Sequence, residues 1–205
     1  MAATRETIQL DDVDHVATNP GRSGEPRIPA LAVGVIVWLS SELMFFSGLF
    51  AASFTLRAKT AVWPPAGVEL GVGRAAIFTV VLIISSFTLH LAVAAARRDD
   101  RVGAVRWLGV TLILGTLFVA NQGLEYADAS FSISSHAYGS MFYLLTGFHG
   151  LHVIGGLLLM GAAVWMISGS TSRAPKVPTM EMCAYYWHFV DLVWVVMFAN
   201  IYLIK

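Results

Sequence analysis

Five long apolar stretches dominate the chain, and most of its charged residues lie outside them, before the first stretch and in the short intervals between stretches. A membrane-spanning helix needs about 20 apolar residues, because every backbone amide must find its hydrogen-bond partner within the same helix. All five stretches reach this length. We therefore predict an all-α, polytopic membrane protein with a bundle of five transmembrane helices, over residues 30–56, 75–96, 105–127, 138–167 and 182–204.

The stretch before the first apolar run, residues 1–29, is polar and charged. The run that follows begins too far along the chain and is too long for the apolar core of a signal peptide, so we interpret it as a permanent helix. The sequence thus predicts a polar N-terminal cytoplasmic segment, residues 1–29, followed by one membrane domain, residues 30–205.

The lysines and arginines predict the orientation, because cytoplasmic loops are enriched in them and an odd number of spans places the termini on opposite sides. The N-terminal side carries nine of these residues: Arg5, Arg22, Arg27, Arg97, Arg98, Arg101, Arg106, Arg173 and Lys176. The opposite side carries four: Arg57, Lys59, Arg74 and Lys205. We expect the N-terminus in the cytoplasm and the C-terminus outside.

Composition narrows the class of function. The chain is 57% hydrophobic and 13% charged, and its formal net charge is zero. No basic excess attracts nucleic acid, so we expect no nucleic-acid partner. The single cysteine, Cys183, excludes an intrachain disulfide and a thiolate pair.

Glu42 is the most unusual residue, because it lies near the middle of the first span, where an acid costs at least about 2.5 to 3.5 kcal/mol to insert. Two interpretations stay open: a structural acid bonded to a neighbouring helix, or a proton-linked group. Counted from the cytoplasmic ends of their helices at about 1.5 Å per residue, Glu42 lies about 18 Å deep and His152 about 22 Å deep. We therefore predict a contact between them, direct or through one water.

Other polar residues inside the spans have weaker signals. His149 and His152 are three residues apart, which places both on one helix face, but two imidazoles without a second cysteine make a poor metal site, so we expect none. His188 and Asp191 have the same spacing and are expected to satisfy each other.

Several residues have simpler expected roles. We expect structural roles for Glu125 and His90, and membrane-interface anchoring for Tyr185 and Tyr186. The glycines of residues 138–167 indicate that this helix lies at the centre of the bundle.

Five motifs occur along the chain in a familiar order: Ser41 to Phe46, Trp63-Pro64-Pro65-Ala66-Gly67, Tyr138-Gly139-Ser140, Thr146 to Val153 and Tyr186 to Asp191. Together they resemble the signatures of cytochrome c oxidase subunit III, in its short, five-helix bacterial form. Many members have seven helices, and this chain resembles the last five.

The resemblance implies a non-redox subunit of an aa3-type oxidase in the bacterial plasma membrane. It packs on core subunit I beside copper A subunit II, and haem a, haem a3, copper B and copper A belong to those partners. Glu42 matches the family's intramembrane glutamate and His152 its partner, within a polar network that also includes His149, His188 and Asp191. The resemblance further implies support of proton uptake, protection during turnover and binding of membrane phospholipids. It leaves open whether a respiratory supercomplex forms.

Two other functions remain as alternatives. One is the equivalent subunit of a quinol oxidase, or an accessory protein of nitric oxide reductase, since these share the fold and variant forms of the motifs. The other is an independent carrier with Glu42 as its proton site, although the lack of repeats and broken helices argues against it.

Overall fold

The computed structural model describes residues 30–65, 67–68, 70–169 and 177–204. The predicted cytoplasmic segment, residues 1–29, lies outside the described residues. The described part is helical, with the elements α1 (Ala30–Lys59), α2 (Val72–Arg97), α3 (Arg101–Asp128), α4 (Ala137–Gly169), α5 (Val177–Phe198) and a π-helical turn, η2 (Ala199–Leu203).

Among the described residues, five helices are long and apolar enough to cross a membrane, which confirms the predicted all-α, five-span architecture. Most helices extend beyond the predicted ends. The largest difference is at α5, which begins at Val177 rather than at residue 182. Pro178 does not prevent this, because the first turn of a helix has no use for the amide hydrogen that proline lacks. The orientation inferred from the basic residues stays a prediction.

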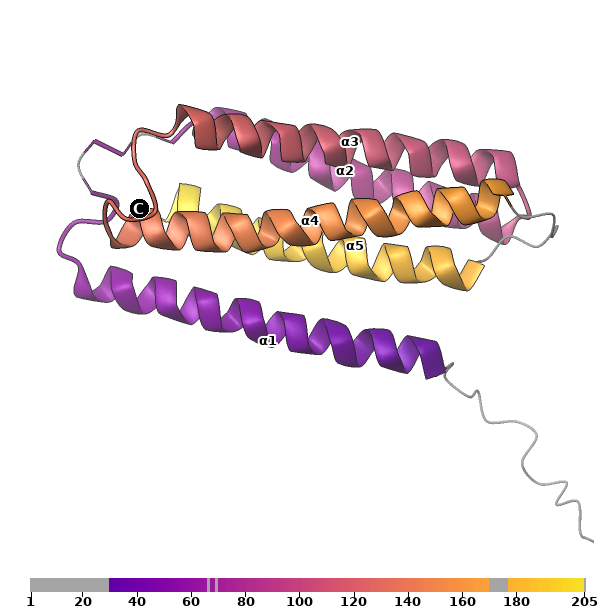
Figure 1. The fold of residues 1–205 in the computed structure, drawn as a ribbon, viewed down its shortest axis with the longest axis horizontal. Coiled ribbons are helices and arrows are strands. Elements are labelled where there is room, and N and C mark those ends of the chain that lie inside the picture. The colour runs from indigo at the N-terminus through magenta and orange to yellow at the C-terminus, as the bar shows by residue number, and fades with distance from the viewer. Residues whose placement is uncertain (1–29, 66, 69, 170–176, 205) are drawn as a thin grey trace, which may run out of the picture.

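The helices run side by side along the long axis of the molecule (Figure 1). α2 packs most extensively against α3, and α4 and α5 complete a group of four helices. α1 lies along one edge, where it contacts α4 and α5. In the apolar stretch of α1, only 6% of the residues are buried, against 39% in the corresponding stretches of α2 and α5. Among the described helices, α1 is therefore the peripheral one.

Trp187 of α5 fills the centre of the four-helix group. Its side chain is fully buried, and its indole Nε1 donates to Ser85 Oγ of α2 at 2.9 Å. A Cβ atom added at Gly156 of α4 would lie 2.8 Å from the indole, and one at Gly115 of α3 would lie 2.7 Å from it. These two glycines let three helices close around one large aromatic side chain.

α4 contacts α1, α3 and α5, so it shares the central position expected of it with α5, which contacts α1, α2 and α4. The role expected of its glycines is only partly correct. Gly155 and Gly156 face Tyr186 and Trp187 closely, whereas a Cβ at Gly150 or Gly161 would meet no atom within 4 Å. Glycine content therefore identified the right helix, but most of its glycines do not mark a close approach.

Candidate functional site

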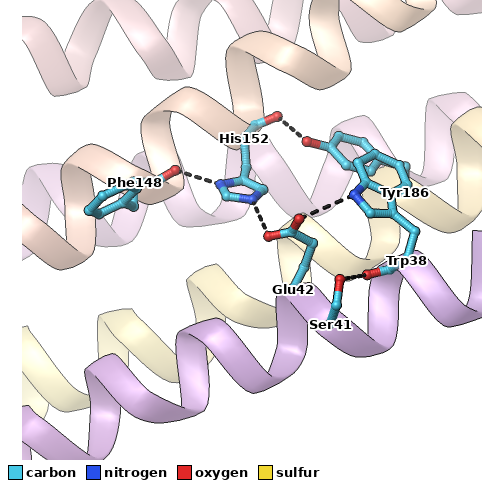
Figure 2. Close-up of polar contacts among 6 residues, drawn as sticks. All are labelled: Trp38, Ser41, Glu42, Phe148, His152 and Tyr186. Carbon is cyan, nitrogen blue, oxygen red and sulfur yellow. Dashed lines mark hydrogen bonds and ion pairs between the residues drawn. The ribbon is translucent and has the colours of Figure 1, made fainter.

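The predicted contact between Glu42 and His152 is confirmed, and it is direct. His152 Nε2 of α4 lies 3.0 Å from Glu42 Oε2 of α1. The side chains are 24% exposed for Glu42 and 16% for His152. Figure 2 shows the carboxyl group of Glu42 between the imidazole ring of His152 and the indole ring of Trp38. The pair joins the peripheral helix to the centre of the bundle.

The second nitrogen of His152 determines what the pair can do chemically. Nδ1 lies 2.7 Å from the backbone carbonyl oxygen of Phe148, and a carbonyl oxygen only accepts, so Nδ1 carries a hydrogen. The atoms Nε2 and Oε2 then share one further proton. With this proton on Oε2 the two groups are neutral, and with it on Nε2 they form an ion pair. The geometry thus holds one transferable proton between α1 and α4.

Trp38, which the sequence analysis did not single out, completes the bonding of the carboxyl group. Its Nε1 donates to Glu42 Oε1 at 3.2 Å. The two residues are one helical turn apart on α1, and the i, i+4 spacing was the available signal. Trp38 also stacks on Tyr186 of α5, with ring centroids 5.1 Å apart. Both oxygens of Glu42 therefore have partners within the chain.

Tyr186 differs from the role expected of it. It is 5% exposed, and its hydroxyl group donates to the backbone carbonyl of His152 at 2.9 Å. The expectation of an interfacial anchor was wrong for Tyr186, because it faces α4 rather than the membrane surface. Tyr185, its neighbour, is 56% exposed and points away from the core.

His149 does not join His152 in one site. It is buried among aromatic rings, 5.1 Å from Trp194 of α5 and 6.0 Å from Phe118 of α3 between ring centroids. Neither of its ring nitrogens has a hydrogen-bond partner in the described structure. Because α4 contacts α1, α3 and α5, a three-residue step was enough to direct the two rings toward different neighbours.

His188 and Asp191 do not bond each other directly in the described chain, so the predicted pairing was wrong. Ser86 of α2 connects them instead. Its hydroxyl group donates to Asp191 Oδ2, and its Oγ lies 2.9 Å from His188 Nδ1. Asp191 is 8% exposed, and its Oδ1 has no partner in the described structure. The partner of both residues thus comes from α2, a helix far from α5 in the sequence. The spacing of residues along α5 alone could not reveal it.

Glu125 is more buried than its place near the end of α3 suggested, at 5% exposed. Tyr202 of η2 donates to its Oε1 at 2.9 Å. Nearby at this end of the bundle, Arg74 and Asp128 form an ion pair at 2.8 Å. His90 is exposed on α2. No group of three or more His, Cys, Asp or Glu side chains suited to a metal ion occurs among the described residues.

The five spanning helices and the acid–imidazole pair between them define a multi-pass helical membrane protein. The sequence matches the model of the family described as "Cytochrome c oxidase subunit III" over residues 6–205. The chain belongs to the cytochrome c oxidase subunit III family.

Three relatives show how closely the sequences correspond. The chain is 45% identical over 196 residues to the probable cytochrome c oxidase subunit 3 of Nocardia farcinica, an alignment that covers 91% of this chain and 97% of the relative. It is 48% identical over 182 residues to the probable cytochrome c oxidase subunit 3 of Mycobacterium tuberculosis, an alignment that covers 85% of this chain and 88% of the relative. The cytochrome c oxidase subunit 3 of Corynebacterium diphtheriae is 40% identical over 199 residues, covering 91% and 97%. The chain is thus a subunit of a proton-translocating oxidoreductase complex, which it forms with other oxidase subunits.

Proposed function

We propose that this chain is the non-redox subunit III of an aa3-type cytochrome c oxidase in a bacterial plasma membrane. In this assignment it packs on core subunit I, beside copper A subunit II. Haem a, haem a3, copper B and copper A belong to those partners. The observation that carries the proposal is the family match over residues 6–205, which includes every spanning helix.

The Glu42–His152 pair supports a more specific role in proton uptake. The two side chains hold one transferable proton, and Trp38 and the carbonyl of Phe148 fix the positions of the carboxyl group and the ring. The pair is partly exposed, so exchange of its proton with a water chain does not require the helices to separate. We assign it the task of supplying protons to the core subunit and so protecting the oxidase during turnover.

Phospholipid contact fits the outer face of α1. Ile36, Val37 and Met44 are 60%, 65% and 78% exposed, which leaves a broad apolar surface along the peripheral helix. In a membrane such a surface is covered by acyl chains or by apolar protein surface. We propose that acyl chains of bound phospholipids lie here.

The direct test of the function is to purify the complex through a tag on this chain and to record its subunits and optical spectrum. The proposal expects haem a absorption and a copper A subunit in equal amount to this chain. A complex with the same core but without copper A would assign the chain to a quinol oxidase instead. Recovery of the chain alone, active as a proton-coupled carrier in liposomes, would contradict the assignment to an oxidase.

A further inference from the structure

A groove runs between α2 and α5 on the outside of the bundle, with a volume of about 520 Å³. Its walls are mainly apolar, but polar side chains line part of it. The residues around it are Ile83, Ser86, Phe87 and His90 of α2, and His188, Asp191, Leu192 and Val195 of α5. The groove shares no lining residue with the Glu42–His152 pair, and α1 lies on the opposite side of the bundle from α2 and α3 (Figure 1).

The polar groups of this groove lie at the depth of the hydrocarbon core. Arg97 and Glu181 form an ion pair at 2.7 Å at one end of the two antiparallel helices. His90 and His188 are each seven residues from that pair, which is about 10 Å along a helix. Asp191 is about one turn deeper. Phospholipid headgroups therefore lie well above these side chains.

The hydrogen bonds within the groove leave donors and acceptors without partners. The Ser86 hydroxyl gives its hydrogen to Asp191, so His188 Nδ1 must donate to Ser86 Oγ. The neutral ring of His188 then has a free acceptor at Nε2. His90 is exposed and has no hydrogen bond within the described chain.

Acyl chains cannot satisfy these imidazoles, because they have neither donors nor acceptors. Ionisable side chains in spanning helices almost always face protein or a water-filled cavity for this reason. Another exposed face of the bundle has the opposite character. On α3, Ile113, Leu117 and Leu124 are 50% to 63% exposed and apolar, as expected for a surface against lipid.

We propose that the α2–α5 groove is the docking surface for a transmembrane helix of another oxidase subunit. This inference rests on the proposed function and adds the face by which the chain binds its partner. The partner helix is apolar, to match Phe87 and Leu192, and carries one hydroxyl or amide side chain at the depth of His188. Such a group donates to the free Nε2, as an acyl chain cannot. His90 lies at the same depth and provides a second hydrogen-bonding position.

Photo-crosslinking in the intact complex tests the face. A photo-reactive phenylalanine analogue replaces Phe87 or Leu192, which are 68% and 60% exposed, and in the control replaces Ile113, which is 63% exposed on α3. Irradiation of the membranes is expected to join the chain to another oxidase subunit from both groove positions and not from Ile113. Crosslinks from the groove only to lipid, or only to a second copy of this chain, would overturn the inference. So would equal crosslinking from Ile113.

Copurification of the same variants before irradiation separates this inference from the proposed function. If the tagged chain brings down the oxidase but crosslinks from Ile113 alone, the function stands and the docking face is wrong. If no oxidase copurifies with wild-type chain, the function itself fails.

His90→Leu gives an independent measurement. A lipid-facing leucine would be tolerated at least as well as histidine, so on a lipid surface this variant stays fully with the oxidase through a detergent wash. At a protein interface it loses a polar contact, and the inference expects a smaller fraction retained than for the control Ile113→Leu. Equal retention of the two variants would count against the docking surface.

Discussion

The bundle contains two polar sites within its spanning helices, and they differ in how far the chain itself satisfies them. Between α1 and α4, both oxygens of Glu42 and both nitrogens of His152 have partners in this chain. Between α2 and α5, Ser86 connects His188 to Asp191, but the exposed His90 has no hydrogen bond within the described chain. The first site is complete within the subunit. The second has unused hydrogen-bonding capacity that another subunit can complete.

The helices around the two sites differ in the same sense. α1 has few contacts with the other helices, so the Glu42 pair is a large part of what fixes its position. α2 and α5 belong to the four-helix group, whose packing around Trp187 does not depend on the polar groups of the groove. Polar contacts thus position a whole helix at the first site, while at the second the exposed imidazoles of His90 and His188 remain available for recognition.

The largest effect on stability is expected from Gly156→Ala. The new Cβ would lie 2.8 Å from the Trp187 ring, which is buried and cannot move aside without displacing α5. Overpacking of this kind costs about 1 to 3 kcal/mol. The thermal unfolding of the purified complex should shift to lower temperature. Gly150→Ala on the same helix is the matched control and should leave it unchanged, because a Cβ there meets no atom within 4 Å. Equal stability of the two variants would show that the four-helix group is not packed as described.

A moderate effect is expected from Trp38→Phe. Phenylalanine keeps an aromatic ring against Tyr186 but removes the hydrogen bond to Glu42 Oε1. The loss of one such bond costs about 0.5 to 1.5 kcal/mol. Chemical unfolding of the complex would measure the loss. The control is Trp165→Phe, since Trp165 is 78% exposed and should be neutral. If Trp38→Phe is also neutral, Trp38 has no part in holding the pair.

The smallest effect is expected from Arg97→Gln, which removes the ion pair with Glu181 at the end of the groove. The two side chains are 59% and 31% exposed, and exposed pairs contribute about 0 to 1 kcal/mol. Thermal unfolding at low salt should occur at a slightly lower temperature in Arg97→Gln than in the control Arg106→Gln. Arg106 forms no ion pair in the described chain. High salt should remove the difference between the two variants. A large loss that salt does not change would mean that Arg97 is buried in the complete complex.

Sequence reasoning predicted the number of helices correctly, because the need to bond every amide within lipid leaves little freedom in length. It also predicted the Glu42–His152 contact, because helical rise converts residue number into depth. It did not identify Ser86 as the partner of His188 and Asp191, because rotation of α2 and α5 about their own axes depends on side-chain packing. The same limit explains why His149, only one turn from His152, lies instead among Phe118 and Trp194.

Glu42→Gln tests whether the complete site has a function beyond holding α1. Glutamine can still accept from Trp38 and can donate to His152 Nε2, so the geometry is retained while the transferable proton of the carboxyl group is lost. Glu125→Gln is the control, because it alters another buried glutamate whose oxygen still accepts from Tyr202.

The decisive measurement is the number of turnovers that each purified oxidase completes before it loses activity, at equal haem content. We expect a severalfold smaller number for Glu42→Gln than for wild type and for Glu125→Gln, together with slower proton uptake. If Glu42→Gln completes as many turnovers before inactivation as wild type and takes up protons at the same rate, the proton-linked role is contradicted. Glu42 would then have a structural role only.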